Sequence, residues 1–171
     1  MSQRIRGFER VSAYQDKDIH LPKRSTHQAA GYDLEAAETV TIKAYWKQVV
    51  DKFLKGEDNQ ADQLLKPSLV PTGLKAYMQE DEYLQIINRS SNPLKRFLIL
   101  PNSVGIIDQD YYNNPDNEGH IYVQLSNFGL NDVTIHKGDR IAQGIFAKYY
   151  KADNDQGGLS QRKGGFGSSG Q

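Results

Sequence analysis

Short runs of alternating apolar and polar residues, each broken by turn residues, most limit how this chain can fold. Segments 121–125 and 133–136 alternate with the two-residue period of a half-buried strand. Two continuous apolar runs, 97–100 and 104–107, indicate strands that are covered on both faces. Many short strands at close spacing predict an all-β sandwich, barrel or jelly roll.

One segment departs from this pattern and predicts a helical insertion at about residues 45–66. Apolar residues recur there at helical spacing and would form one stripe: Trp46, Val49, Val50, Phe53 and Leu54. A second short helix is expected at 61–65, before Pro67. The favoured interpretation is a lid over exposed sheet, and the alternative is a docking site for a regulatory protein partner.

Composition limits the partners of the chain. The 171 residues suffice for one domain with a core, and 21 basic residues balance 21 acidic ones. The absence of a basic excess argues against nucleic acid, and the absence of a long apolar run argues against a membrane. With no cysteine, disulfides and thiolate metal sites are excluded. We expect a cytoplasmic protein that binds a small charged ligand.

The end of the chain is rich in glycine. Six glycines fall between residues 157 and 170, which is the composition of a flexible segment. We therefore expect a β domain over residues 1–152 and a C-terminal arm over residues 153–171.

Several residues could carry the chemistry of a nucleotide hydrolase. A β fold has few helix N-termini for phosphate, so it must use guanidinium groups, hydroxyls and amides. Candidates for these contacts are Arg89, Ser90, Ser91, Gln143, Arg162, Ser168 and Ser169. Asp108 ends an apolar run, where a carboxylate is held rigidly and partly desolvated, so it is the candidate general base. Asp110 is expected to cap a turn.

Five motifs in order resemble those of the trimeric dUTPases. They are Ala30–Leu34, Arg89–Ser91, Asn102–Tyr111, Gly138–Gln143 and Arg162–Gly170. The resemblance implies a jelly roll of the β-clip type, a homotrimer, and Mg²⁺-dependent hydrolysis of dUTP to dUMP and diphosphate. It also implies a phage or Gram-positive bacterial member of the family, and so the host cytoplasm in the phage case.

The resemblance assigns roles to residues around the base and the sugar. Asp108 would activate the water that attacks the α-phosphorus. Tyr111 would pack under the deoxyribose and exclude a 2′-hydroxyl. Asn102 and the backbone near Ile106, Ile107 and Tyr122 would recognise uracil.

Further roles fall on the arm and on the metal. Phe166 would stack on the base, and Gly167, Ser168 and Ser169 would contact phosphate. Asp33 would hold a water in the outer shell of a Mg²⁺ ion carried by the phosphates. Arg162 lies four residues before Phe166, where five is commoner, so Arg162 or Lys163 contacts the γ-phosphate.

Two other functions are open from the sequence. A dCTP deaminase, or a bifunctional relative, would share the fold, but Gln124 stands where that family has a catalytic glutamate. A nucleotide-regulated binding module would use the insertion at 45–66. A second insertion, 112–118, lengthens a hairpin beside the expected uracil site. We expect the four histidines, His20, His27, His120 and His136, at the surface or in loops.

Overall fold

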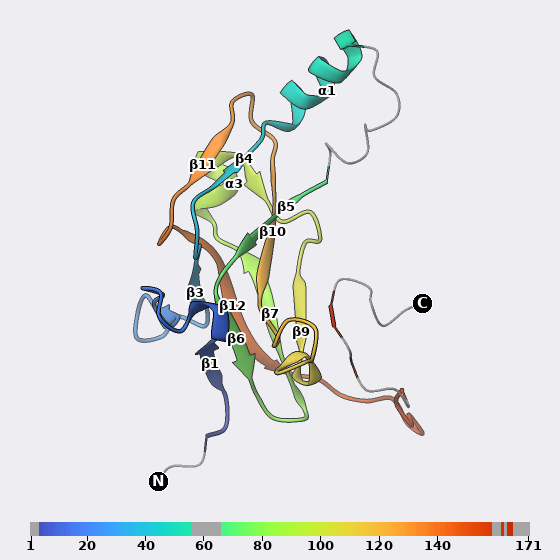
Figure 1. Ribbon diagram of the computed structural model, residues 1–171. Coiled ribbons are helices and arrows are strands. Elements are labelled where there is room, and N and C mark those ends of the chain that lie inside the picture. The colour runs from blue at the N-terminus through green and yellow to red at the C-terminus, as the bar shows by residue number, and fades with distance from the viewer. Residues whose placement is uncertain (1–3, 56–65, 159–161, 163, 166–171) are drawn as a thin grey trace.

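The protein is an all-β jelly roll, shown by a computed structural model that describes residues 4–55, 66–158, 162, 164 and 165 (Figure 1). The strands are β1 (Gly7–Arg10), β2 (Lys23–Arg24), β3 (Tyr32–Glu35), β4 (Val40–Ile42), β5 (Ser68–Pro71), β6 (Leu74–Tyr77), β7 (Glu82–Asn88), β8 (Leu98–Ile99), β9 (Gly105–Asp108), β10 (Tyr122–Asn127), β11 (Val133–Ile135) and β12 (Arg140–Lys148). They form sheets ordered β2-β3-β12-β7-β9, β5-β10-β8, β4-β11 and β1-β6 around one hydrophobic core.

The longest strand, β12, organises the five-stranded sheet, in which every pairing is antiparallel. Gln143 of β12 lies opposite Asp33 of β3, and Asp108 of β9 lies opposite Tyr83 of β7. Arg89 directly follows β7, six residues after Tyr83. At about 3.3 Å of rise per residue, these two ends of β7 are about 20 Å apart.

The alternating segments fold as predicted, and the continuous apolar runs contain the predicted strands, β8 and β9, but are not covered on both faces throughout. Strand β10 alternates half-buried and buried residues along its length, as a half-buried strand should. In the run at 104–107, Ile106 is 52% exposed, so the prediction of a strand covered on both faces is wrong there. In the run at 97–100, Phe97 is exposed because it adopts a left-handed conformation and ends a helix.

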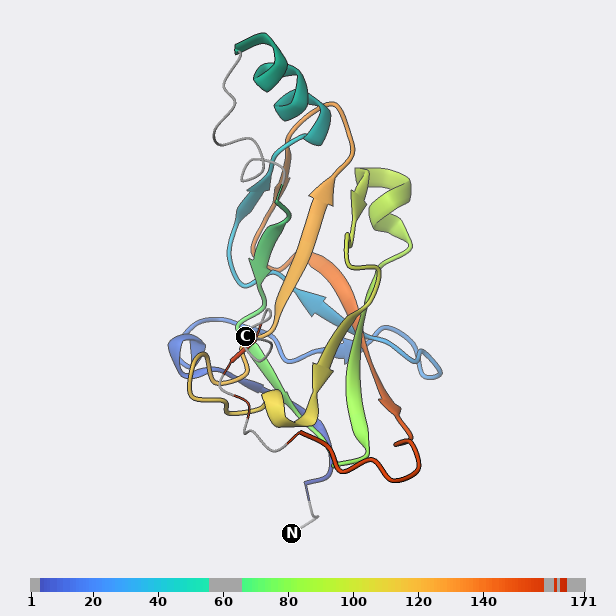
Figure 2. The same cartoon turned by 90° about the vertical axis from the view of Figure 1, so that its right-hand side faces the viewer.

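Helix α1 (Tyr45–Lys55) forms where the apolar stripe predicts a helix, but it projects from the sandwich beyond β4 and β11 (Figures 1 and 2). Phe53 and Leu54 are 86% and 76% exposed, so the lid interpretation is wrong for the described part of the insertion. The helix is held at its start, where the Tyr45 ring stacks on Phe128 at 5.1 Å and Trp46 meets both rings edge-on. The helix expected at 61–65 lies outside the described residues.

A short helix, α3 (Ser91–Arg96), was not expected from the sequence. Pro93 falls in its first turn, where a backbone N–H has no partner within the helix, so proline costs little there. The buried Asn92 side chain fixes the helix to the sheet by donating to the Asn88 side chain and to the Ile141 carbonyl, each at 2.8 Å. Within the described ranges, no helix is long and apolar enough to cross a bilayer.

His120 lies in the loop before β10, within the prediction of surface or loop positions, but it is buried, with 6% of its surface exposed. Its Nε2 accepts a hydrogen bond of 2.9 Å from the Gly73 N–H. The rings of Tyr14 and Tyr122 pack against it, with centroids 5.3 and 4.1 Å away. Burial lowers the pKa of His120 to about 4, so the ring is neutral near pH 7.

Candidate active site

A pocket of about 210 Å³ lies between β9 and β10, and we call it the β9–β10 pocket. It brings together six residues predicted from the sequence: Asn102, Ile106, Ile107, Tyr111, Tyr122 and Arg162. The sequence named Gln124 only as the residue that replaces a deaminase glutamate, and it assigned no role to the other lining residues: Ile86, Leu100, Gly105, Val123 and Gly165. The volume is below the roughly 300–1,000 Å³ of pockets for drug-sized ligands, so the pocket suits one ring system rather than a whole nucleotide.

Strand β9 is the last strand of its sheet, so one row of its N–H and C=O groups has no strand partner among the described residues. Gly105 faces Ile86 on the paired strand, and a Cβ there would lie 3.2 Å from the Ile86 Cβ. The glycine therefore lets the strand approach its neighbour closely. The open backbone edge beside an apolar pocket can form hydrogen bonds with the polar edge of a planar ring.

Tyr111 forms one wall of the pocket and is 6% exposed. Its hydroxyl donates to the His120 carbonyl oxygen at 3.0 Å and accepts from Asn117 Nδ2 at 2.8 Å. Burial raises the pKa of Tyr111, so its hydroxyl keeps its proton at neutral pH. From the arm, Gly165 packs so closely on the ring that a Cβ there would lie 2.8 Å from Tyr111 Cε2.

Asp108 lines a second, larger cleft of about 760 Å³, which shares Ile106 and Arg162 with the β9–β10 pocket. The Asp108 side chain is 49% exposed and pairs with the Arg162 guanidinium. Arg162 also donates from Nε to Asp110 at 2.7 Å. Asp108 therefore lies within reach of water. Asp110 pairs with Arg162, in place of the turn-capping bond predicted for it.

A separate group of side chains surrounds Asp33, and we call it the Asp33 cluster. Four side chains donate to its carboxylate: Ser25 at 2.5 Å, Arg89 at 3.0 Å, Arg140 at 3.2 Å and Gln143 at 3.4 Å. Burial opposes ionisation of Asp33, but the Ser25 hydrogen bond and the charge of Arg89 together hold the pKa below its usual value. Arg140 and Ser25 were not predicted as site residues, although Arg140 lies within the Gly138–Gln143 motif.

The other predicted phosphate contacts lie at the same end of the fold. Ser90 precedes α3, and Ser91 Oγ accepts from Arg89 Nη1 at 3.4 Å. Phe166, Gly167, Ser168 and Ser169 lie outside the described residues. The predicted site residues therefore form two groups in one chain, and Asp108 and Arg89 lie at opposite ends of β7.

The donor atoms around Asp33 bear on the expected metal. Both of its oxygens already accept two hydrogen bonds each, two of the four from guanidinium groups, so no inner-sphere position is open. Across the part of the chain that the structure describes, no three acidic or histidine side chains gather as direct metal ligands. The residues fit a divalent ion only through water, on a ligand that brings its own oxygen atoms.

An apolar ring pocket that opens beside a half-exposed carboxylate is an arrangement that suits a nucleotide hydrolase. Comparison with known proteins narrows that class. The dUTPase family model matches residues 57–170. The deoxyuridine 5'-triphosphate nucleotidohydrolase of Lactococcus lactis is 50% identical over 168 residues, which covers 98% of this chain and 99% of the relative. The chain belongs to the dUTPase family.

Solved structures agree with this assignment. The crystal structure of the dUTPase from Streptococcus mutans matches with a TM-score of 0.72 and 44% identity, covering 86% of this chain and 99% of that chain. The dUTPase from phage phi11 of S. aureus matches with a TM-score of 0.65 at 16% identity, covering 90% of this chain and 96% of that chain, which supports the fold alone.

Proposed function

We propose that this protein hydrolyses dUTP to dUMP and diphosphate, in the cytoplasm of its own cell or of a phage host. The observation that carries the proposal is the β9–β10 pocket opening onto the cleft that holds Asp108. A base in the pocket would leave its sugar beside Tyr111 and its α-phosphate toward Asp108. Membership of the dUTPase family selects uracil as the base.

Recognition of uracil would come from the backbone edge near Ile106 and Ile107, with the Asn102 amide beside it. The Tyr111 ring would lie under the sugar. A ribose carries one more oxygen than deoxyribose, and the buried ring, held at its hydroxyl, cannot move aside to admit it. Tyr122 would close the pocket from β10.

Asp108 would orient a water for in-line attack on the α-phosphorus and accept its proton. The Arg162 guanidinium pairs with this carboxylate in the structure. A triphosphate carries more negative charge than one carboxylate, so it competes well for a guanidinium. Transfer of Arg162 to the nucleotide would free Asp108 to accept the proton.

The Asp33 cluster would bind phosphate through Arg89, Ser90, Ser91 and Gln143. Because it lies about 20 Å along β7 from Asp108, it cannot serve the Asp108 of its own chain closely. We propose a homotrimer in which this end of one subunit meets the pocket end of the next. A closed symmetric ring makes such a contact three times with one pair of surfaces.

We propose Mg²⁺ as the cofactor, carried by the phosphate oxygens. When bound, it neutralises part of the charge on the transferred group and on the leaving group. Asp33 would contact that ion through water only, since its oxygens are occupied by protein donors. Arg89 and Arg140 would neutralise phosphate charge directly.

We propose that the arm, residues 153–171, completes the site. Phe166 would stack on the base, a contact worth roughly 1–3 kcal/mol in other base-binding proteins. Deleting residues 161–171 should sharply reduce turnover and leave the fold and the trimer intact. A truncated protein with full activity would remove the arm from the mechanism.

The proposed function is tested by measuring diphosphate release from dUTP, dTTP, dCTP and UTP. We expect strong preference for dUTP. Deamination of dCTP is the alternative, but Gln124 lines the pocket where a proton-carrying carboxylate would be needed, and an amide cannot serve. Formation of uracil nucleotides from dCTP would establish deamination. A protein partner at α1 stays a prediction, supported by its exposed stripe.

A further inference from the structure

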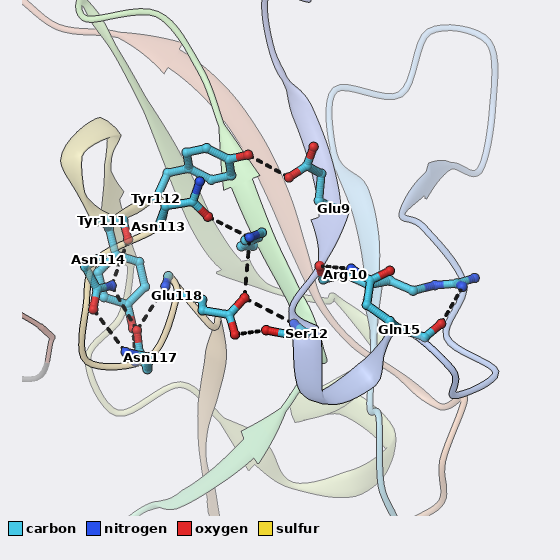
Figure 3. Close-up of polar contacts among 12 residues, drawn as sticks. Glu9, Arg10, Ser12, Gln15, Tyr111, Tyr112, Asn113, Asn114, Asn117 and Glu118 are labelled. Atoms are coloured by element: carbon cyan, nitrogen blue, oxygen red, sulfur yellow. Dashed lines mark hydrogen bonds and ion pairs between the residues drawn. The ribbon is translucent and has the colours of Figure 1, made fainter.

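The hairpin insertion 112–118 packs against the site residue Tyr111 (Figure 3). Asn114 is buried and donates to the Tyr111 backbone carbonyl at 2.8 Å. The loop closes on itself, since Asn113 N–H donates to the Glu118 carbonyl and Glu118 N–H donates to the Asn114 carbonyl. Gly119, with φ of +82°, lies where a Cβ would approach the Tyr111 carbonyl to 2.6 Å. The insertion therefore has a defined conformation.

Within this loop, the orientation of one amide is fixed by its other contacts. Asn117 Oδ1 accepts from Gly119 N–H at 3.0 Å and from Asn114 Nδ2 at 2.9 Å. With the oxygen occupied by two donors, Asn117 Nδ2 is left to donate to the Tyr111 hydroxyl at 2.8 Å. That hydroxyl has one hydrogen, which it gives to the His120 carbonyl. Both contacts of the hydroxyl thus come from the segment that follows Tyr111.

The loop is bound to the sheet of β1 and β6 and to the segment that follows β1, as Figure 3 shows. Glu118 accepts from the backbone and the hydroxyl of Ser12, and these bonds lower the pKa of its carboxyl. Lys75 donates to Asn113 at 2.6 Å and pairs with Glu118 at 3.5 Å. Tyr112 donates to Glu9 at 2.6 Å. These contacts hold the loop, and with it Asn117, against strands β1 and β6.

We infer that Asn117 is a positioning residue that sets the place of the Tyr111 ring and thereby the preference for deoxyribose over ribose. This inference rests on the proposed role of Tyr111 at the sugar. A ring held at its hydroxyl from two sides cannot tilt away from an added 2′-oxygen. Without the Asn117 bond, the ring is held by one hydrogen bond, and the pocket admits the ribose more easily.

The test compares kcat/KM for dUTP and for UTP in Asn117→Ala, Tyr111→Phe, Tyr111→Ala and the Tyr111→Phe/Asn117→Ala double variant. Both substrates are measured on one preparation, so a loss of folded protein cancels from the ratio. Asp116→Ala is the matched control, because Asp116 is exposed and adjacent in the same loop. Asn117→Leu is the second variant, since it keeps the size of the side chain and removes both its donor and its acceptor, whereas an aspartate could accept the Tyr111 hydroxyl proton and restore the contact.

We expect Asn117→Ala and Asn117→Leu to lower the dUTP/UTP ratio roughly 2- to 10-fold, the range for one net hydrogen bond. Asp116→Ala should leave it unchanged, and the double variant should match Tyr111→Phe, since both changes break the same bond. An unchanged ratio in both Asn117 variants, with Tyr111→Ala lowered, would overturn the inference and leave the role of Tyr111 standing. An unchanged ratio in Tyr111→Ala would overturn both.

Discussion

The β9–β10 pocket and the Asp33 cluster, which we propose as two halves of one site, have opposite character. The pocket is apolar, formed by packing, and ready for a ring before any ligand arrives. The cluster is polar, and its cations are already bound to a carboxylate. The pocket can therefore select by shape, whereas the cluster can offer phosphate the guanidinium N–H groups that Asp33 does not occupy.

The two ends also differ in charge. Among the described residues, the ion pairs of Asp33 with two guanidinium groups leave one positive charge, whereas those of Asp108 and Asp110 with Arg162 leave one negative charge. Under the proposed function, phosphate would bind at the first end and the proton released from water would go to the second. Opposite charges at the two ends of β7 also favour the meeting of unlike ends between neighbouring subunits.

The largest effect on turnover should come from a substitution at Asp108, in the end of the site with net negative charge. Asp108→Asn keeps the shape and removes the proton acceptor, so turnover should fall about 10²- to 10⁴-fold while nucleotide binding persists. Steady-state kinetics and calorimetric titration measure the two quantities. Asp110→Asn is the matched control, with the smaller loss. Turnover of Asp108→Asn within about threefold of wild type, on that scale, would exclude Asp108 as the base.

The next largest effect on catalysis should come from a substitution at Arg89, in the end of the site with net positive charge. Arg89→Ala should lower kcat/KM about 10- to 100-fold, since a hydrogen bond to a charged group contributes about 1.5–3 kcal/mol. Arg89→Lys should recover little, because an ammonium lacks the planar fork.

Co-expressing Arg89→Ala chains with Asp108→Asn chains sharpens the comparison. If the two halves of each site come from different subunits, mixed trimers contain sites with both halves intact, and activity exceeds that of either variant alone. Activity no higher than the sum of the two separate variants would mean that each chain uses its own halves.

As the pH falls, the loss of stability that comes from His120 should precede the loss that comes from Asp33. His120 has a pKa of about 4 when folded and about 6.5 when unfolded, so the unfolded chain binds more protons between these values. Its contribution is complete above about pH 6.5 and is lost as the pH falls toward 4. The depressed pKa of Asp33 acts at lower pH, because its contribution is lost only below the ordinary carboxyl range.

The free energy of unfolding should therefore drop by about 2 kcal/mol between pH 7 and pH 5 through His120. Urea titrations at one fixed protein concentration measure this, since an oligomer is stabilised by its concentration. His120→Gln, whose amide can still accept from Gly73, should lack this drop. An equal pH dependence in wild type and variant would contradict the assignment.

The smallest effect should come from Ser25→Ala, which removes one donor from Asp33. We expect a loss of about 1 kcal/mol of stability, the usual net value of one hydrogen bond. Thermal unfolding beside Thr26→Ala, an exposed neighbour, provides the control. Equal melting temperatures for the two variants would show that Arg89, Arg140 and Gln143 suffice to hold Asp33.

The sequence predicted the β9–β10 pocket better than the cluster. Residues of one hairpin region, such as Asn102, Ile106 and Tyr111, lie close together in the chain, so the motif itself places them. Ile86 and Gly165 come from distant segments: Ile86 reaches the pocket through the pairing of β7 with β9, and Gly165 reaches it from the arm, against the Tyr111 ring. Arg140 joined the Asp33 cluster through the β3–β12 register, which no local pattern reveals.

Residues whose burial differs from what the sequence indicated do so for identifiable physical reasons. His120 is buried because its ring fits between Tyr14 and Tyr122 and finds a donor in Gly73, a tertiary arrangement without a sequence signature. Ile106 is exposed because an edge strand at a pocket keeps one face open. The stripe of α1 has the right spacing for a buried helix, but spacing alone does not say what covers it.

The aromatic contact at the start of α1 gives the protein an intrinsic fluorescence probe. Trp46 is the only tryptophan of the protein, and it lies against Tyr45 and Phe128, away from the residues that line the β9–β10 pocket. The fluorescence of Trp46 therefore monitors the start of the projecting helix α1. A ring that stacks in the β9–β10 pocket does not contact this tryptophan and so does not change its emission directly. A change in that emission when nucleotide is added would reveal a signal passed through the jelly roll to α1.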